Sequence, residues 1–108
     1  MDTDEQREIR SDFDDAVTMT PAALEEWLAT DESKSVGQSS GGESTGHRSG
    51  RRIVELLRTK VADLSDDDYR HMRKVTGYVH RHLAQRPSGD VEHSKWRYSL
   101  MNWGHDPL

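Results

Sequence analysis

Cysteine is absent from this chain of 108 residues. Its absence excludes disulfide bridges, catalysis by a thiol and metal sites built on thiolates. Apolar residues are also scarce, because they make up 31% of the sequence against 32% for charged residues. A chain of this length is expected to form one domain, and so little apolar material predicts a thin hydrophobic core.

Long hydrophobic runs are missing as well. No stretch approaches the ~20 apolar residues that a membrane-spanning helix needs. The chain starts with MDTDEQREIRSDFDD, which is acidic where a signal peptide would be basic and then apolar. We therefore expect a cytoplasmic location.

The charges are distributed unevenly along the chain. The net charge is −5, but residues 1–32 sum to −9, residues 33–62 sum to +4, and residues 63–108 are balanced. Residues 69–89 carry five basic side chains and no acidic one. An acidic arm thus precedes a basic middle, which fits an anionic partner or an acidic segment resting on a basic surface. A mixed, solvated surface accounts for the pattern equally well.

Two helices are predicted in the acidic arm, residues 4–32. Ile9, Phe13 and Val17 recur at helical spacing and predict a first helix over residues 4–17. The second helix begins after Thr20, a good N-cap that is followed by a proline at the first helical position. Because only the short segment TMT separates the two helices, we expect an antiparallel hairpin.

Three further helices are predicted in residues 51–108. The first is amphipathic, with Ser49 as its candidate cap. Ser65 and Asp68 have the spacing of a capping box at the start of the next, long helix. A shorter helix near the end of the chain stops at Gly104. No segment alternates like a strand, so the fold class is all-α, a small bundle of four to five helices.

A long Ser/Gly-rich loop, residues 33–50, separates the second and third helices. Eleven of its eighteen residues are Ser or Gly, and loops of this length in a small domain are usually functional or disordered. Arg48, Ser49, Arg51 and Arg52 lie at the expected start of the third helix. Free N–H groups and the helix dipole attract anions there. We interpret these four residues as candidate anion-binding or nucleic-acid-binding residues.

Two other interpretations of this loop remain open. It can be a flexible linker between a two-helix arm and a three-helix body. It can also pack on its own domain, with Glu43 and His47 holding it in place. The loop does not match the phosphate-loop motif, which needs Gly-Lys-Ser/Thr after a strand.

The long fourth helix carries a basic stripe opposite its apolar face. Arg70, Lys74 and Arg81 form this stripe, and Gly77 lies beside it. A helix that follows phosphates needs such a stripe, and a glycine lets another backbone approach closely. The alternative is a solvated outer face that keeps a small domain soluble.

Other chemistries are not favoured. The third and fourth predicted helices could form a helix-turn-helix, whose second helix presents its N-terminal end to DNA. Here that end carries the three acids of residues 66–68, which DNA phosphates would repel. A plain helical hairpin is therefore the preferred interpretation. His80 and His82 point to different sides of their helix, and we expect no metal and no cofactor. No nucleophile, base and orienting group are placed together by spacing, so we expect no enzymatic activity.

Four phrases of the sequence are distinctive. They are FDDAVTMTPAALEEWLATDESKSVG, GGESTGHRSGRRIVELL, DDDYRHMRKVTGYVHRHLAQRP and WRYSLMNWGHDP. Together they resemble the bacterial and fungal family catalogued as domain of unknown function 3140, from about residue 13 to residue 107. Members are often labelled DNA-binding and have no assigned catalytic residues. The resemblance implies that the Ser/Gly stretch is part of the domain, and it implies as contact residues Arg48, Arg51 and Arg52, with Arg70, Lys74 and Arg81 behind them.

Two functions of different class follow from these observations. The first is non-catalytic binding of an anionic polymer, DNA in the first place, through phosphate contacts of the basic loop and helix face. The second is a small protein-interaction or stress-associated module, in which the acidic first helix docks on a protein partner. We also hypothesise that the acidic arm covers the basic surface as an autoinhibitor.

Overall fold

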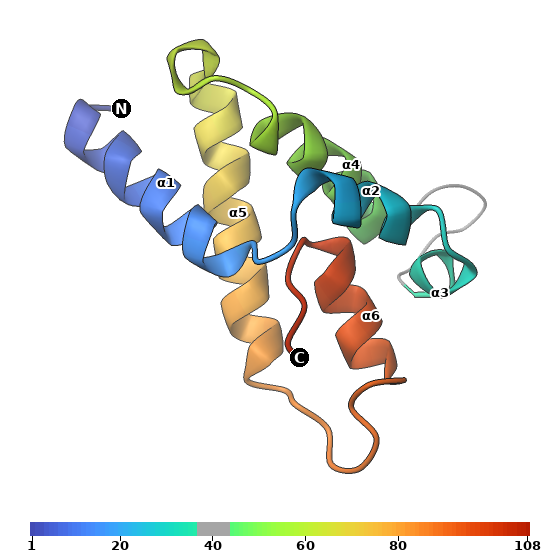
Figure 1. Cartoon of the computed structure of the whole chain (residues 1–108). Helices are drawn as coiled ribbons and strands as arrows, with labels where there is room; N and C mark the ends of the chain where they lie inside the picture. The colour runs from blue at the N-terminus through green and yellow to red at the C-terminus, as the bar shows by residue number, and fades with distance from the viewer. Residues whose placement is uncertain (37–43) are drawn as a thin grey trace.

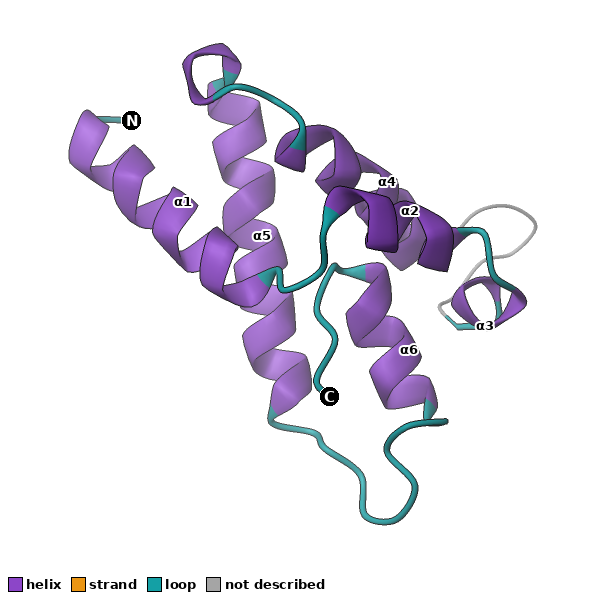
Figure 2. Ribbon diagram, in the orientation of Figure 1, coloured by secondary structure: helices purple, strands orange, loops and turns teal. Residues whose placement is uncertain are grey.

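The computed structural model describes residues 1–36 and 44–108, and all regular elements in these residues are helical (Figures 1 and 2). The predicted all-α class is confirmed. The elements are α1 (Thr3–Ala16), α2 (Pro21–Leu28), α3 (Asp31–Lys34), α4 (Thr45–Leu57), a single 3-10 turn η1 (Val61–Asp63), α5 (Asp66–Leu83) and α6 (Lys95–Asn102). The short helix α3 was not predicted, and it occupies the start of the expected Ser/Gly loop.

Two helix starts are formed by the caps that the sequence predicted. The Thr20 hydroxyl accepts the backbone N–H of Ala23 at 3.1 Å, directly before α2. At the start of α5, the Ser65 hydroxyl accepts the N–H of Asp68 at 3.1 Å, and the Asp68 carboxylate accepts the N–H of Ser65 at 3.0 Å. Each bond satisfies an N–H group that has no partner within the helix. Both predictions are confirmed.

The first two helices pack on different neighbours. α1 packs along α5, whereas α2 packs along α4 (Figure 1). The predicted hairpin of the first two helices is therefore wrong. The turn between them explains the difference, because the N–H groups of Thr18 and Met19 both donate to the Gly104 carbonyl at 3.0 Å. This tie to the end of the chain directs α2 away from α1.

The third and fourth predicted helices, α4 and α5, also do not form the close hairpin that we expected. α4 packs against α2 and α6, while α5 packs against α1 and α6. α4 and α5 are joined by side chains instead, such as the ion pair between Arg52 and Asp67 at 2.7 Å. Contacts between long polar side chains therefore connect α4 and α5, while their backbones do not pack closely along each other.

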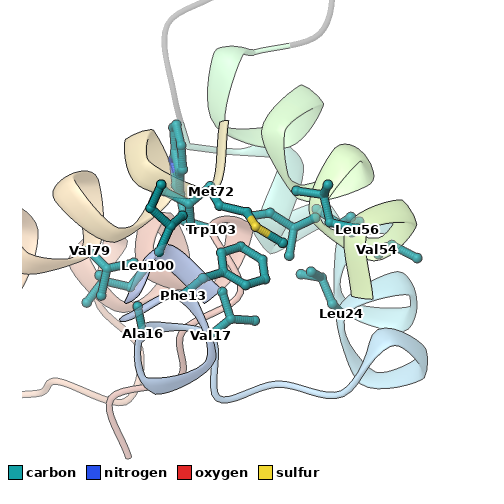
Figure 3. Close-up of a cluster of buried hydrophobic side chains, with 14 of the residues drawn as sticks. Phe13, Ala16, Val17, Leu24, Val54, Leu56, Met72, Val79, Leu100 and Trp103 are labelled. Atoms are coloured by element: carbon teal, nitrogen blue, oxygen red, sulfur yellow. The ribbon is translucent and has the colours of Figure 1, made fainter. Parts of the chain in front are cut away.

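One hydrophobic core draws on α1, α2, α4, α5 and α6. Phe13 and Met72 lie at its centre, with Leu24 on one side and Val79 and Leu100 on the other (Figure 3). Burying one such side chain contributes about 1.5–3 kcal/mol. The low apolar content of the chain is therefore concentrated in one continuous core.

The start of α4 differs from the prediction. The helix begins at Thr45 rather than after Ser49, because the Ser44 hydroxyl accepts the N–H of His47 at 3.1 Å and caps it. The expected loop of residues 33–50 is therefore shorter at both ends. Its residues 37–43, which include Glu43 and its proposed role in holding the loop, lie outside the described residues.

Gly50 allows α4 to approach α2 and α6 closely. A Cβ atom at this position would lie 2.7 Å from the Leu28 side chain and 2.5 Å from the Asn102 carbonyl oxygen. Both distances are shorter than van der Waals contact, so no larger residue fits without moving a helix. This part of the Ser/Gly-rich stretch serves helix packing.

Asn102 joins three helices through a buried hydrogen-bond network. Its side chain is 1% exposed. The Oδ1 atom accepts the Trp27 indole N–H at 2.7 Å and the Ser33 hydroxyl at 2.5 Å. The Nδ2 group donates to the Ser33 carbonyl at 3.0 Å. These bonds connect α2 and α3 to the last residue of α6.

Replacing Asn102 with Ala tests this network. The N102A variant leaves the Trp27 indole N–H and the Ser33 hydroxyl without their acceptor in a buried site, and we expect it to lose about 3 kcal/mol of unfolding free energy. Urea unfolding followed by circular dichroism measures the loss. Lys95→Ala on the exposed first turn of α6 is the control and should change little. Equal stability of the two variants would show that the network does not stabilise the fold.

Candidate anion-binding site

The arginines predicted at the start of the third helix lie farther along α4. The N–H groups without intrahelical partners belong to Thr45 and Gly46. The predicted placement of Arg48, Arg51 and Arg52 at the positive helix end is therefore wrong, since the cap is Ser44. Arg48 and Arg51 are exposed on α4, and Arg52 is half-buried.

Ser49 is not accessible to a ligand. It is 4% exposed, and its hydroxyl oxygen lies 3.1 Å from Nε2 of His71 on α5. The contact joins α4 to α5. Ser49 was predicted to bind an anion, but the structure places it between helices, where it has a packing role.

Arg52 and Arg70 are neutralised by the acidic start of α5. Arg52 forms ion pairs with Asp67 at 2.7 Å and with Asp68 at 3.3 Å, and Arg70 pairs with Asp67 at 3.4 Å. The hydrogen bond from Arg52 lowers the pKa of the Asp67 carboxyl below its ordinary value. These carboxylates compete with any external anion for two of the predicted cations.

Lys74 and Arg81 are the predicted cations that the structure brings together around a cavity. Both are exposed on α5, and both line a cavity of about 370 Å³. Within residues 1–36 and 44–108, neither side chain forms a hydrogen bond or an ion pair. Their positive charges are therefore available to an anion. Arg51 lines a different hollow, between α2 and α4.

Stacked aromatic rings form one wall of this cavity. The rings of Tyr78 on α5 and Trp103 after α6 are nearly parallel, with centroids 4.2 Å apart. Burial raises the pKa of Tyr78, while its hydrogen bond to Ser99 opposes that shift. Tyr78 is therefore neutral at physiological pH. The two exposed cations are thus placed beside a packed aromatic surface.

The first turn of α4 forms another part of the cavity. Thr45 and Gly46 line it, and the N–H groups of these residues have no partners within the helix. The α4 dipole adds positive potential at this end. Sequence reasoning missed this contribution because it placed the helix start several residues too late. The Ser-Thr-Gly segment before His47 contained the signal, since Ser is a preferred N-cap.

The acidic first helix lies on the other side of α5. Glu5 of α1 pairs with Arg73 at 2.8 Å, and Gly77 faces the hollow between α1 and α5. No residue of α1 lines the cavity that contains Lys74 and Arg81. The hypothesis that the acidic arm covers the basic surface does not hold for these two cations. Gly77 lies beside the basic stripe as predicted, and the Arg81 guanidinium occupies the space next to it, since a Cβ atom there would lie 3.0 Å from Arg81 Nη1.

The described ranges contain neither a metal-binding cluster nor a membrane-spanning helix. In residues 1–36 and 44–108, no three His, Asp or Glu side chains are grouped so that they could hold a metal ion. In the same residues, no helix has the length and apolar character needed to cross a membrane.

The pH dependence of stability is expected to report on the contact between α4 and α5. Burial, followed by the charges of Arg52 and Lys74, lowers the pKa of His71. The unfolded chain therefore binds a proton near pH 6.5 that the folded chain does not bind, and folding stability falls as the pH drops below about 6.5. His82, whose pKa is also lowered mainly by burial, contributes in the same direction.

Urea unfolding between about pH 7 and pH 5 checks this expectation. The His71→Gln variant should show a shallower loss of stability than the unmodified chain. Asp67 and Asp106, whose pKa values are lowered, lose their stabilising effect only below about pH 4, outside this window. An unchanged slope in the variant would contradict the assigned role of His71.

Comparison with known proteins identifies the family but no further relative. No curated protein and no solved structure matches the chain. Residues 12–101 match the family model described as "Protein of unknown function (DUF3140)". This match covers most of the chain, and it includes α2, α4, α5 and the cavity residues from Thr45 to Ser99. The chain therefore belongs to the DUF3140 family.

Proposed function

We propose that this protein is a non-catalytic binding domain that contacts the phosphates of DNA through Lys74 and Arg81. The observation that carries the proposal is the pair of exposed cations beside one cavity, neither with an ionic partner in the described part of the chain. Arg48 and Arg51 are also exposed on α4, and Arg51 lines a separate hollow between α2 and α4. The net charge of −5 is compatible with this, because the acidic residues of α1 lie on the opposite side of α5.

The charge pattern favours contact with phosphates over the reading of bases. Asp66, Asp67 and Asp68 occupy the first turn of α5, and this end would be repelled by the phosphates that border a DNA groove. Lys74 and Arg81 lie farther along the helix and away from these acids. Phosphate contacts fix a protein on DNA without selecting its sequence. The proposed binding is therefore independent of sequence and sensitive to salt.

A second candidate function rests on the outer face of α1. Its exposed acidic residues are Asp4, Glu8, Asp12, Asp14 and Asp15. Glu8 and Asp12 also line the hollow of about 310 Å³ between α1 and α5. Such a surface suits a basic segment of a protein partner. Titration with a lysine-rich peptide, compared with DNA, separates this candidate from the first.

A fluorescence titration of labelled duplex DNA tests the proposed function. The double variant Lys74→Ala/Arg81→Ala should bind more weakly than the unmodified chain at low salt. Because two phosphate contacts are lost, the slope of log K against log salt concentration should fall by about 2 in magnitude. The matched control is Arg73→Ala/Arg86→Ala, which removes the same charge from residues outside the cavity.

The control distinguishes a specific surface from general electrostatic attraction. It should retain most of the affinity, since Arg73 pairs with Glu5 and Arg86 lies over the Trp96 ring at 5.6 Å. Equal weakening of both double variants would contradict the role of the cavity cations. No binding by the unmodified chain at low salt would rule out DNA as the ligand.

A further inference from the structure

The cavity beside Lys74 and Arg81 is lined by hydrogen-bond donors. The two cations supply ammonium and guanidinium groups, and the first turn of α4 supplies backbone N–H groups. No described residue that lines the cavity has a carboxylate. Asn102 Oδ1 is already occupied by two donors. The lining is therefore complementary to an anion with several oxygen atoms.

The indole N–H of Trp103 is a donor in the wall of the cavity. Trp103 is 4% exposed and lines the cavity. The other two tryptophans donate their indole N–H groups at short distance, Trp27 to Asn102 at 2.7 Å and Trp96 to the His82 carbonyl at 2.6 Å. Among the described residues, Trp103 has no such acceptor. The side chain is almost entirely buried while its N–H is open to the cavity, so this donor is available to a ligand.

Gly46 keeps the space beside this donor open. A Cβ atom at Gly46 would lie 3.1 Å from Nε1 of Trp103 and 3.7 Å from the neighbouring Cδ1 atom. The glycine is the second residue of α4, a helix of 13 residues, so its own N–H group has no partner within the helix. The backbone N–H groups of this turn and the indole N–H therefore line the same cavity.

We propose that this cavity is a binding site for a phosphate monoester. A terminal phosphate group has three free oxygen atoms and about two negative charges at neutral pH, and it suits both the positive end of a helix and the forked donors of Arg81. A phosphodiester has only two free oxygen atoms, so it satisfies fewer of these donors. The inference rests on the proposed function in that both use Lys74 and Arg81.

The ligand can be the terminal phosphate of a DNA strand or a free mononucleotide. Both present the same phosphate monoester, and the aromatic wall of Tyr78 and Trp103 can contact the apolar part of either.

Nuclear magnetic resonance of the indole N–H groups provides a direct test with internal controls. Inorganic phosphate and deoxythymidine monophosphate are added in turn to the 15N-labelled full chain, and Trp103→Phe assigns the signals. The Trp103 signal should move downfield and saturate. The Trp27 and Trp96 signals should stay in place because these donors already have acceptors. Dimethyl phosphate, a diester, should produce a much smaller shift.

Gly46→Ala is the specific variant. Its methyl group would cover the indole N–H of Trp103, and we expect a roughly tenfold loss of phosphate affinity, as for one lost hydrogen bond. Thr3→Ala, at the corresponding first position of α1, is the control, because α1 lines no part of this cavity. Urea unfolding verifies that both variants are folded, and alanine is favoured over glycine in a helix.

The outcomes distinguish this inference from the proposed function. Failure of phosphate and the mononucleotide to move the Trp103 signal, or an equal shift with dimethyl phosphate, would overturn the phosphate-monoester site even if DNA binds. A saturable shift of Trp103 that Gly46→Ala weakens supports the site even if DNA does not bind, and the free mononucleotide is then the source. Stronger binding of duplex DNA with 5′-phosphates than without them identifies the strand end as the source.

Discussion

The arrangement of this protein depends on the close approach of α4 and α6 at Gly50 and Asn102. The missing Cβ of Gly50 lets α4 lie against the Asn102 backbone, while the Asn102 side chain holds α2 and α3 by hydrogen bonds to Trp27 and Ser33. The next residue is Trp103, which stacks on Tyr78 of α5. The same contact that joins the helices therefore also sets the position of the cavity wall, so fold and candidate site cannot be changed independently.

The pairing of charges decides which part of the basic surface is available. Arg52 and Arg70 pair with Asp67, and Arg73 pairs with Glu5, so these cations already have carboxylate partners within the chain. Exposed pairs of this kind are worth ~1 kcal/mol or less, yet each places a negative charge where an external anion would otherwise bind. Lys74 and Arg81 have no such partner in the described ranges. The charge balance of the chain as a whole does not reveal this local difference.

Local signals in the sequence predicted the helices well, and contacts between distant segments were not predicted. The caps at Thr20 and Ser65 involve residues only three positions apart, so periodicity and capping rules were sufficient to place α2 and α5. The hairpin of the first two helices was wrong because Gly104, far along the chain, fixes their turn. The basic stripe of Lys74 and Arg81 was predicted from spacing alone. The role of Trp103 in the cavity was not, because it depends on how α6 packs against α4 and α5.

The central claim is that an anion binds beside Lys74, Arg81 and the first turn of α4. Mapping of backbone amide shifts on addition of a short DNA duplex at low salt tests it most directly. The account predicts that the largest shifts cluster at Thr45, Gly46 and the α5 residues from Lys74 to Arg81, with little change in α1. Shifts confined to α1, or spread evenly over the surface, would contradict it.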